Sequence, residues 1–174
     1  TGKTTLVIGG GNTAMDCCRT ARRLGGKQVN VIIRGARESM KASPWEVEDA
    51  IREDIPILEH LSPLEFVMAG DRLKGMNFQQ LQGGKTDPET VFIPCDEVLL
   101  AVGQQNAFPW IEKDIGFAFD DKDRPRVDEI TFQSDLDHVF FGGDAAFGPK
   151  NVITAVAHGH EAAISIDLFC NGKD

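Results

Sequence analysis

Cysteine motifs typical of metal or redox sites are missing from this sequence. Its four cysteines form no C-x-x-C motif and no spacing typical of a zinc or iron–sulfur site. Cys17 and Cys18 are adjacent, and neighbouring side chains on a helix diverge by about 100°, so we do not expect them to pair. We expect four reduced thiols, no metal site, and no redox-active cysteine pair of the kind that a disulfide reductase needs.

Long apolar segments are lacking as well. No stretch reaches the roughly 18 apolar residues of a membrane span, and no charged-then-apolar leader opens the chain. The sequence therefore predicts a soluble, cytoplasmic protein without a membrane partner. Because it starts at Thr1 without an initiator Met and enters an apolar strand almost at once, we also expect it to be a piece of a longer chain.

Positive charge is scarce overall, since 18 Lys and Arg residues face 27 Asp and Glu residues, for a net charge of −9. A nucleic acid requires a broad basic face, so we expect none as a partner. Basic residues do gather between positions 17 and 41, where Glu38 is the only acid: Arg19, Arg22, Arg23, Lys27, Arg34, Arg37 and Lys41. This local charge favours a small anionic ligand, although the first three arginines also fit a solvated helix face.

Strand and helix patterns alternate at the start of the chain. The apolar run at residues 5–8 is typical of a buried parallel strand. A helix is predicted over residues 12–24, ended by Gly25 and Gly26, and a strand rich in Val and Ile follows over residues 28–33. Together these segments predict one βαβ unit.

A second helix and a third strand are expected next. Ser43, Pro44 and Glu46 form the pattern of a capped helix start, so we expect a helix to about residue 54. The short apolar run at residues 55–58 then predicts a third strand of the sheet.

The pattern changes after residue 64. An antiparallel meander is predicted from there, with turns at Gly70-Asp71 and Gly83-Gly84, before the apolar run at residues 98–102 returns to the core. Beyond it the chain is rich in loops, until a strand over residues 138–141 and a closing helix over residues 151–169. The sequence thus predicts an α/β fold, with a Rossmann-like nucleotide-binding domain over residues 1–102 and a second part over residues 103–174.

A glycine cluster between the first strand and helix carries the clearest chemical signal. Gly9, Gly11 and Ala14 stand at the three special positions of a dinucleotide fingerprint. The first permits a tight turn, the second lets a pyrophosphate approach the backbone, and the third keeps the helix close to the strand. Phosphates would bind the free N–H groups at the helix start. The predicted site comprises Gly9, Gly10, Gly11, Asn12, Thr13 and Ala14.

The end of the second strand indicates which dinucleotide binds. An NAD site usually places an acid there, whereas an NADP site uses Arg to hold the 2′-phosphate. Here Arg34 and Arg37 follow the strand and no acid does. Because a guanidinium can bind a phosphate through two donors, this favours NADP(H) over NAD(H). Arg34 as a solvated loop residue stays open as an alternative.

A second glycine cluster follows the strand expected at residues 138–141. Gly143 and Asp144 end that strand, and a helix starts near Asn151. An Asp in this place can accept hydrogen bonds from ligand hydroxyls, and the positive end of the helix can stabilise negative charge. The same pattern also fits an ordinary strand–turn–helix connection, so both interpretations stay open.

Four stretches in order, VIGGGNTAMDC, IRGARESM, DEVLLAVGQ and FGGDAAFGPKNVITAVAHGHEAA, resemble the small (β) subunit of NADPH-dependent glutamate synthase and its relatives. Those relatives include part of dihydropyrimidine dehydrogenase and the large subunit of certain ferredoxin:NADP oxidoreductases. The resemblance implies a flavoprotein in which an NADPH-binding domain is inserted into an FAD-binding domain. Hydride would pass from NADPH to FAD, and electrons would continue through iron–sulfur clusters to a partner such as the glutamate synthase large subunit.

The resemblance also implies roles for single residues. Arg34 and Arg37 match arginines near the 2′-phosphate, whereas Gly35 departs from a frequent second Arg. Asp144 matches a ligand of the FAD ribityl chain, and Asn151 with Val152 matches the helix start that faces the flavin pyrimidine. The remaining implied cofactor contacts are at Gly103, where the chain crosses between domains, and at Gly143.

Parts of the family pattern are missing from this chain. It has neither the glycine fingerprint that binds the FAD pyrophosphate nor the cysteines that bind iron–sulfur clusters. We therefore expect residues 103–174 to be the C-terminal portion of an FAD-binding domain, inactive alone and able to self-associate. No catalytic residue is predicted, since His158 and His160 lie on different faces of their helix. A reductase of ferredoxin or another acceptor, or a non-catalytic nucleotide-binding module, remains an alternative.

Overall fold

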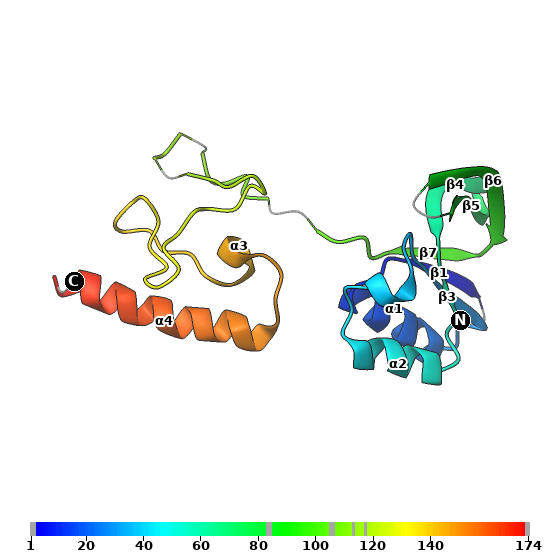
Figure 1. The fold of residues 1–174 in the computed structure, drawn as a ribbon, viewed down its shortest axis with the longest axis horizontal. Helices are drawn as coiled ribbons and strands as arrows, with labels where there is room; N and C mark the ends of the chain where they lie inside the picture. The colour runs from blue at the N-terminus through cyan, green and yellow to red at the C-terminus, as the bar shows by residue number, and fades with distance from the viewer. Residues whose placement is uncertain (1–2, 83–84, 105–106, 113, 117, 173–174) are drawn as a thin grey trace. The chain divides into compact units, whose positions relative to one another are not determined.

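The computed structural model describes residues 3–82, 85–104, 107–112, 114–116 and 118–172. Contacts between residues divide the chain into two compact units, unit 1 (Thr1–Gly103) and unit 2 (Gln104–Asp174). Figure 1 shows the strands and helices of unit 1 and the helices α3 and α4 of unit 2.

Unit 1 contains a parallel sheet with the strand order β3-β2-β1-β7. Val7 at its centre is paired with Val31 on one side and with Leu99 on the other. The predicted βαβ unit is confirmed, because α1 connects the parallel strands β1 and β2. The elements are β1 (Thr4–Ile8), α1 (Asn12–Arg23), β2 (Gln28–Ile32), the 3₁₀ turn η1 (Arg37–Ser39), α2 (Pro44–Arg52), β3 (Ile57–Leu58) and β7 (Glu97–Leu100).

Alternating side chains of the central strands build two cores. Val7 and Val31 pack on one face with Met15 of α1, and this core extends to Ala50 of α2. Leu6 packs on the opposite face with Phe78. Successive side chains of a strand point to opposite faces, so an unbroken apolar run is what a sheet covered on both sides requires.

The second face of the parallel sheet is covered by an antiparallel sheet. Its strands β4 (Leu61–Ala69), β5 (Arg72–Gln82) and β6 (Lys85–Pro94) pair in the order β4-β5-β6. This confirms the predicted meander. The turn predicted at Gly83-Gly84 lies outside the described residues.

Helices α1 and α2 lie side by side (Figure 1). Ion pairs connect them. Arg19 of α1 pairs with Glu46 at 2.8 Å, with Asp49 at 3.1 Å and with Glu53 at 3.0 Å. Hydrogen bonds from Arg23 and Arg19 hold the pKa of the Glu53 carboxyl below its usual value. Arg19 is therefore a bridge between helices and not the solvated residue that the sequence allowed.

Unit 2 has less regular structure. It contains α3 (Gly143–Phe147), which the sequence did not predict, and α4 (Val152–Cys170). The strand predicted at residues 138–141 is wrong, because this segment forms only a single bridge between Phe140 and Gln133. A strand needs a continuous ladder of hydrogen bonds with a neighbour, and the described residues supply none here.

α4 begins and ends close to its predicted limits. The Asn151 side chain accepts hydrogen bonds from the N–H of Thr154 at 2.9 Å and from its hydroxyl at 2.7 Å, as expected of an N-cap. None of its 19 residues is buried, although the helix is largely apolar. Its exposed large apolar residues are Val152, Ile153, Val156, Ile164, Ile166, Leu168 and Phe169.

Three further observations bear on the type of protein. None of the helices in the described part of the chain has the length and apolarity that a membrane crossing requires. The described residues contain no cluster of three or more His, Cys, Asp or Glu side chains suited to a metal ion. All four cysteines are free, and burial raises the pKa of the Cys18 thiol to about 11.

Candidate functional site

The glycine cluster forms a tight connection between β1 and α1. Gly9 has a φ of +141°, and a Cβ added there would lie 2.2 Å from the carbonyl oxygen of Ala101. Only glycine fits this position, because the backbone conformation and the close approach both exclude a side chain. The tight turn predicted for Gly9 is thus required by packing within the chain.

No backbone angle and no contact within the described chain requires a glycine at position 11. Its φ of −101° and ψ of 176° are open to any residue, and a Cβ there would meet nothing within 4 Å. The space over its backbone is available to a ligand. This is the geometry that the fingerprint predicts where a pyrophosphate approaches the main chain.

The start of α1 supplies free donors beside this space. The Gly11 carbonyl accepts hydrogen bonds from Ala14 at 3.0 Å and from Met15 at 3.3 Å, which closes the first helical turn. The N–H groups of Asn12 and Thr13 donate to no acceptor among the described residues. Ala14 is completely buried and keeps the helix close to the strand. Orphan N–H groups at a helix start favour an anion.

A segment from another part of unit 1 braces the loop. The Gly10 carbonyl accepts hydrogen bonds from Lys41 and Ala42, both at 3.0 Å. The Asn12 side chain accepts one from the Ser43 N–H at 2.7 Å and donates to the Ser43 hydroxyl at 3.4 Å. The predicted side-chain cap by Ser43 is wrong, because this residue makes no capping bond to α2. Asn12 is thus engaged within the chain.

Arg34 and Arg37 follow β2 in the predicted place. Both are exposed, and neither guanidinium has an ion pair with a described residue. Gly35 between them is confined, because an added Cβ would lie 2.5 Å from the Ser39 hydroxyl. An Arg at position 35 would therefore require the Ser39 side chain to move.

Sequence reasoning missed an acid near these arginines. The Glu59 carboxylate accepts a hydrogen bond from the Arg37 N–H at 3.0 Å, and His60 donates from its backbone to Gly35 at 3.3 Å. Glu59 follows β3, and the carboxyl ends of parallel strands meet at one edge of a sheet. Glu59 lies beside Arg37 because β3 pairs with β2 in a register that the sequence does not predict.

Unit 2 brings the second set of candidates together. The exposed Asp144 carboxylate accepts a hydrogen bond from the Lys150 N–H at 3.1 Å, so it lies beside the start of α4. Asn151 caps this helix, and the Val152 side chain is 78% exposed. Gly143, with a φ of +60°, donates its N–H to His158 at 3.0 Å. Gly103 is the last residue of unit 1, and the chain passes from there to unit 2.

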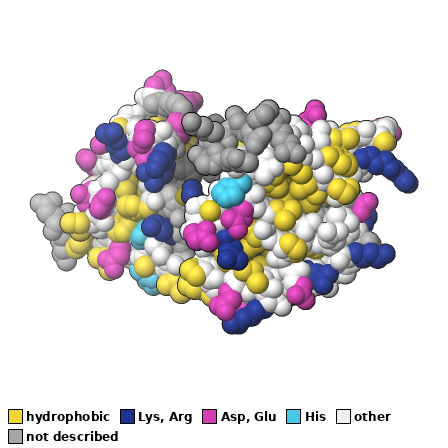
Figure 2. All heavy atoms as spheres, turned by 45° about the vertical axis from the view of Figure 1, so that its right-hand side comes forward, with side chains coloured by type: hydrophobic (Ala, Val, Ile, Leu, Met, Phe, Trp, Pro, Cys, Tyr) yellow, Lys and Arg dark blue, Asp and Glu magenta, His cyan; other side chains and the backbone are white. Residues whose placement is uncertain are grey.

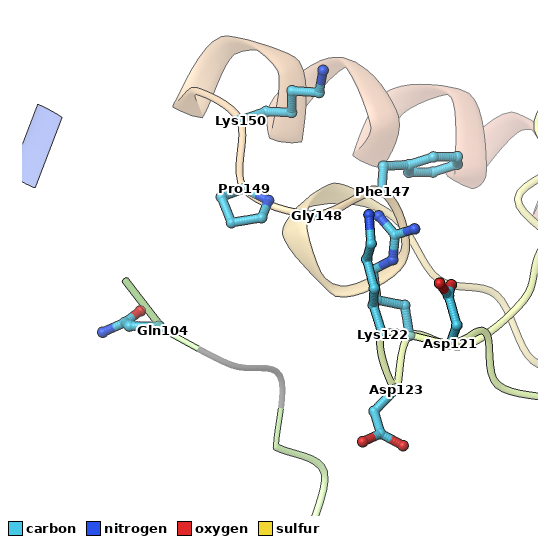
Figure 3. A pocket seen from close by; sticks show the side chains of 9 residues that line it. Gln104, Asp121, Lys122, Asp123, Phe147, Gly148, Pro149 and Lys150 are labelled. Atoms are coloured by element: carbon cyan, nitrogen blue, oxygen red, sulfur yellow. The ribbon is translucent and has the colours of Figure 1, made fainter. Parts of the chain in front are cut away.

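An open cavity of about 630 Å³ adjoins this cluster. Lys122 extends toward Gly148, whereas Asp123 points the other way (Figure 3). A hydrogen bond from Arg124 lowers the pKa of Asp120, next to the cavity, to about 2. The cavity is lined by Gln104, Asp121, Lys122, Asp123, Arg124, Phe147, Gly148, Pro149 and Lys150.

Charges of both signs are mixed on the molecular face in Figure 2, where described Lys and Arg side chains alternate with Asp and Glu. On this face the basic residues form no continuous area. The free N–H groups of Asn12 and Thr13 at the glycine cluster suit a small phosphate-bearing ligand.

Comparison with known proteins identifies the family of this chain. Residues 1–159 match the family model described as pyridine nucleotide-disulphide oxidoreductase. The chain is 35% identical over 179 residues to the NADP(+)-dependent formate dehydrogenase subunit beta of Moorella thermoacetica, covering 97% of this chain and 25% of that protein. It is 34% identical over 180 residues to the glutamate synthase [NADPH] small chain of Halomonas elongata, covering 95% of this chain and 38% of that one.

The resemblance to glutamate synthase small subunits is thereby confirmed, although the chain spans less than half the length of these relatives. The fold is similar to that of thioredoxin reductase from T. acidophilum, with a TM-score of 0.84 and 23% identity, covering 98% of this chain and 53% of that one. At this identity the likeness establishes the α/β fold alone. By the match over residues 1–159, the chain belongs to the pyridine nucleotide-disulphide oxidoreductase family.

Proposed function

We propose that this chain binds NADPH on unit 1, as the NADPH-binding part of a flavoprotein oxidoreductase. The observation that carries the proposal is Gly11, whose backbone borders open space next to the free N–H groups of Asn12 and Thr13. A pyrophosphate fits there because it supplies acceptors for these donors and negative charge for the helix start. The domain boundary that we propose is near residue 102.

The preference for NADPH over NADH rests on Arg34 and Arg37. Their guanidinium groups are exposed and have no ion pair with a described residue. A 2′-phosphate at this strand end would gain charge-assisted hydrogen bonds from them. Glu59 opposes the phosphate by its charge but binds the Arg37 backbone, so it leaves both guanidinium groups available.

We further propose that unit 2 supplies part of an FAD site. The residues that would hold the cofactor are Asp144, by accepting hydrogen bonds from ribityl hydroxyls, and Asn151 and Val152, at the start of α4. The cluster fits this role because Asp144 is exposed, its carboxylate accepts a single hydrogen bond from the described residues, and it lies beside a helix N-terminus. When bound, FAD would accept a hydride from NADPH and pass the two electrons on one at a time.

The acceptor of the electrons is proposed from the relatives. Several of them are named as subunits, among them the glutamate synthase [NADPH] small chain and the NADPH-Fe(3+) oxidoreductase subunit beta of Geobacter sulfurreducens. We infer that electrons leave through iron–sulfur clusters outside this chain to a partner subunit. A glutamate synthase large subunit is one such partner, and another electron acceptor is the alternative. Four free cysteines support a reducing, cytoplasmic location.

Rapid mixing tests this function. The flavin-loaded protein that carries this chain is mixed with NADPH without oxygen, and flavin absorbance is followed. We expect the absorbance to fall in the parent and to stay constant in Gly11→Val, whose side chain fills the space over the phosphate loop. Bleaching at the same rate in both proteins would show that hydride reaches the flavin without this loop.

A further inference from the structure

The His158 side chain is joined to the turn that precedes Asp144. Its Nδ1 accepts a hydrogen bond from the Gly143 N–H at 3.0 Å, across 15 residues of sequence. An imidazole nitrogen that accepts a hydrogen bond carries no proton, so the neutral ring must hold its proton on Nε2. The contact therefore fits one tautomer of the neutral His158 ring.

Packing keeps the imidazole in this place. The ring centroid lies 4.6 Å from that of Phe147 and 5.3 Å from that of Phe132, so aromatic side chains on two segments contact it. A Cβ added at Gly142 would lie 3.1 Å from the His158 Cβ. The backbone at residues 142–143 is thus in close contact with α4 at His158.

The joined turn is the one that holds Asp144. Gly143 precedes it directly and has a φ of +60°, a conformation that L side chains rarely adopt. On the other side, Lys150 donates its N–H to the Asp144 carboxylate. His158 therefore fixes the backbone ahead of Asp144, and the start of α4 fixes its carboxylate.

We propose that His158 is a positioning residue for the FAD contact at Asp144, acting through the Gly143 N–H. That His158 holds the Gly143 backbone in place depends only on this chain. That this affects FAD binding rests on the proposed function. His160 lies two residues further along α4 and is exposed, and its side chain makes no hydrogen bond or ring contact with a described residue. It provides a matched control.

The first test measures hydrogen exchange of the Gly143 amide by NMR in the 174-residue chain. His158→Phe keeps an aromatic ring but removes the acceptor, whereas Asn at position 158 keeps an acceptor oxygen close to the place of Nδ1. Loss of a neutral hydrogen bond corresponds to roughly fivefold faster exchange. We expect that acceleration in His158→Phe and parent-like exchange in His158→Asn and His160→Phe. Equal exchange in all four proteins would overturn the inference.

The parent chain provides a reading that needs no variant. In ¹⁵N-labelled histidine, Nδ1 and Nε2 have distinct chemical shifts that report which nitrogen carries the proton. We expect the His158 proton on Nε2 at neutral pH. A proton on Nδ1 would contradict the hydrogen bond from the Gly143 N–H. This measurement remains decisive if the His158→Phe variant fails to fold.

The second test measures FAD affinity in the flavin-binding protein that carries this chain. We expect the Kd for FAD to rise roughly fivefold in His158→Phe and to stay unchanged in His158→Asn and His160→Phe. Faster amide exchange with unchanged FAD affinity would overturn the link from His158 to the cofactor. Absence of FAD binding in the parent would instead contradict the proposed function. The exchange data alone would then decide whether His158 holds the Gly143 backbone in place.

Discussion

The side-chain oxygen of Asn12 accepts a hydrogen bond from the Ser43 N–H at 2.7 Å, which joins the first residue of α1 to the residue before α2. The Gly10 carbonyl binds the neighbouring N–H groups of Lys41 and Ala42. The phosphate loop is thus braced by a segment about 30 residues further along the chain. Such bracing keeps a binding loop in one conformation before its ligand arrives.

Substitutions of Asn12 should separate bracing from phosphate binding. Asn12→Ala removes the acceptor for Ser43, so we expect the free energy of unfolding to fall by about 1 kcal/mol and NADPH affinity to fall with it. Asn12→Asp keeps the acceptor but adds a negative charge beside the phosphates. It should leave stability close to that of the parent and still weaken NADPH binding. Urea unfolding and calorimetric titration measure the two effects, and equal stability of the two variants would contradict the bracing role.

Two glycines of the same loop should respond in opposite ways. Gly11→Val places its side chain in empty space but replaces the N-cap of α1 by a poorer one. We therefore expect the free energy of unfolding to fall by no more than about 1 kcal/mol, while NADPH binding is lost. Gly9→Ala brings a Cβ onto the Ala101 carbonyl, so we expect a loss of about 1–3 kcal/mol of stability. Thermal unfolding and titration with NADPH check both. Normal binding by a folded Gly11→Val protein would exclude this loop as the site.

Local patterns were sufficient for the phosphate loop. The apolar runs of β1 and β2, and the glycines between β1 and α1, depend on residues that are near one another in sequence, so their structure follows from period and turn chemistry. The strand predicted at residues 138–141 failed because pairing depends on a neighbour, and only Phe140 makes a bridge, to Gln133.

Contacts between distant residues could not be predicted in the same way. Glu59 reaches the Arg37 backbone through the register of β2 and β3, and His158 reaches Gly143 from a helix that starts nine residues after it. Ser43 had the sequence pattern of an N-cap, yet its hydroxyl is used by Asn12. In each case the partner is set by tertiary packing and not by spacing along the chain.

The ion pair between Asp120 and Arg124 should make stability depend on pH in acid. Hydrogen bonds from Arg124 lower the pKa of Asp120 from 3.8 to about 2, so the folded state favours the ionised form. Its contribution is complete above about pH 4 and disappears as the pH falls toward about 2. In urea unfolding, the difference in stability between the parent and Asp120→Asn should vanish over that range. Asp121→Asn serves as the control, and a difference that persists unchanged at pH 2 would contradict the assignment.

The exposed apolar residues of α4 predict self-association of the isolated chain. Val152, Val156 and Ile164 are each more than half exposed, and surfaces of this kind are usually covered by another surface. Light scattering should show a dimer or larger species, and Val156→Glu with Ile164→Glu should shift it toward monomer.

The purified chain should also be colourless, because a few hydrogen bonds of about 1 kcal/mol each do not offset the cost of immobilising FAD. A yellow monomer would contradict both expectations.

Nucleotide titration tests the central claim, that unit 1 binds NADPH through the phosphate loop and the arginines after β2. Affinities for NADPH and NADH are measured by calorimetry on the parent and on Arg34→Ala, with Arg22→Ala as a control that lies on α1. We expect the parent to prefer NADPH, and Arg34→Ala to lose about 1.5–3 kcal/mol of that preference, while NADH affinity stays unchanged and Arg22→Ala resembles the parent. Equal affinity for the two nucleotides in both the parent and Arg34→Ala would contradict the account.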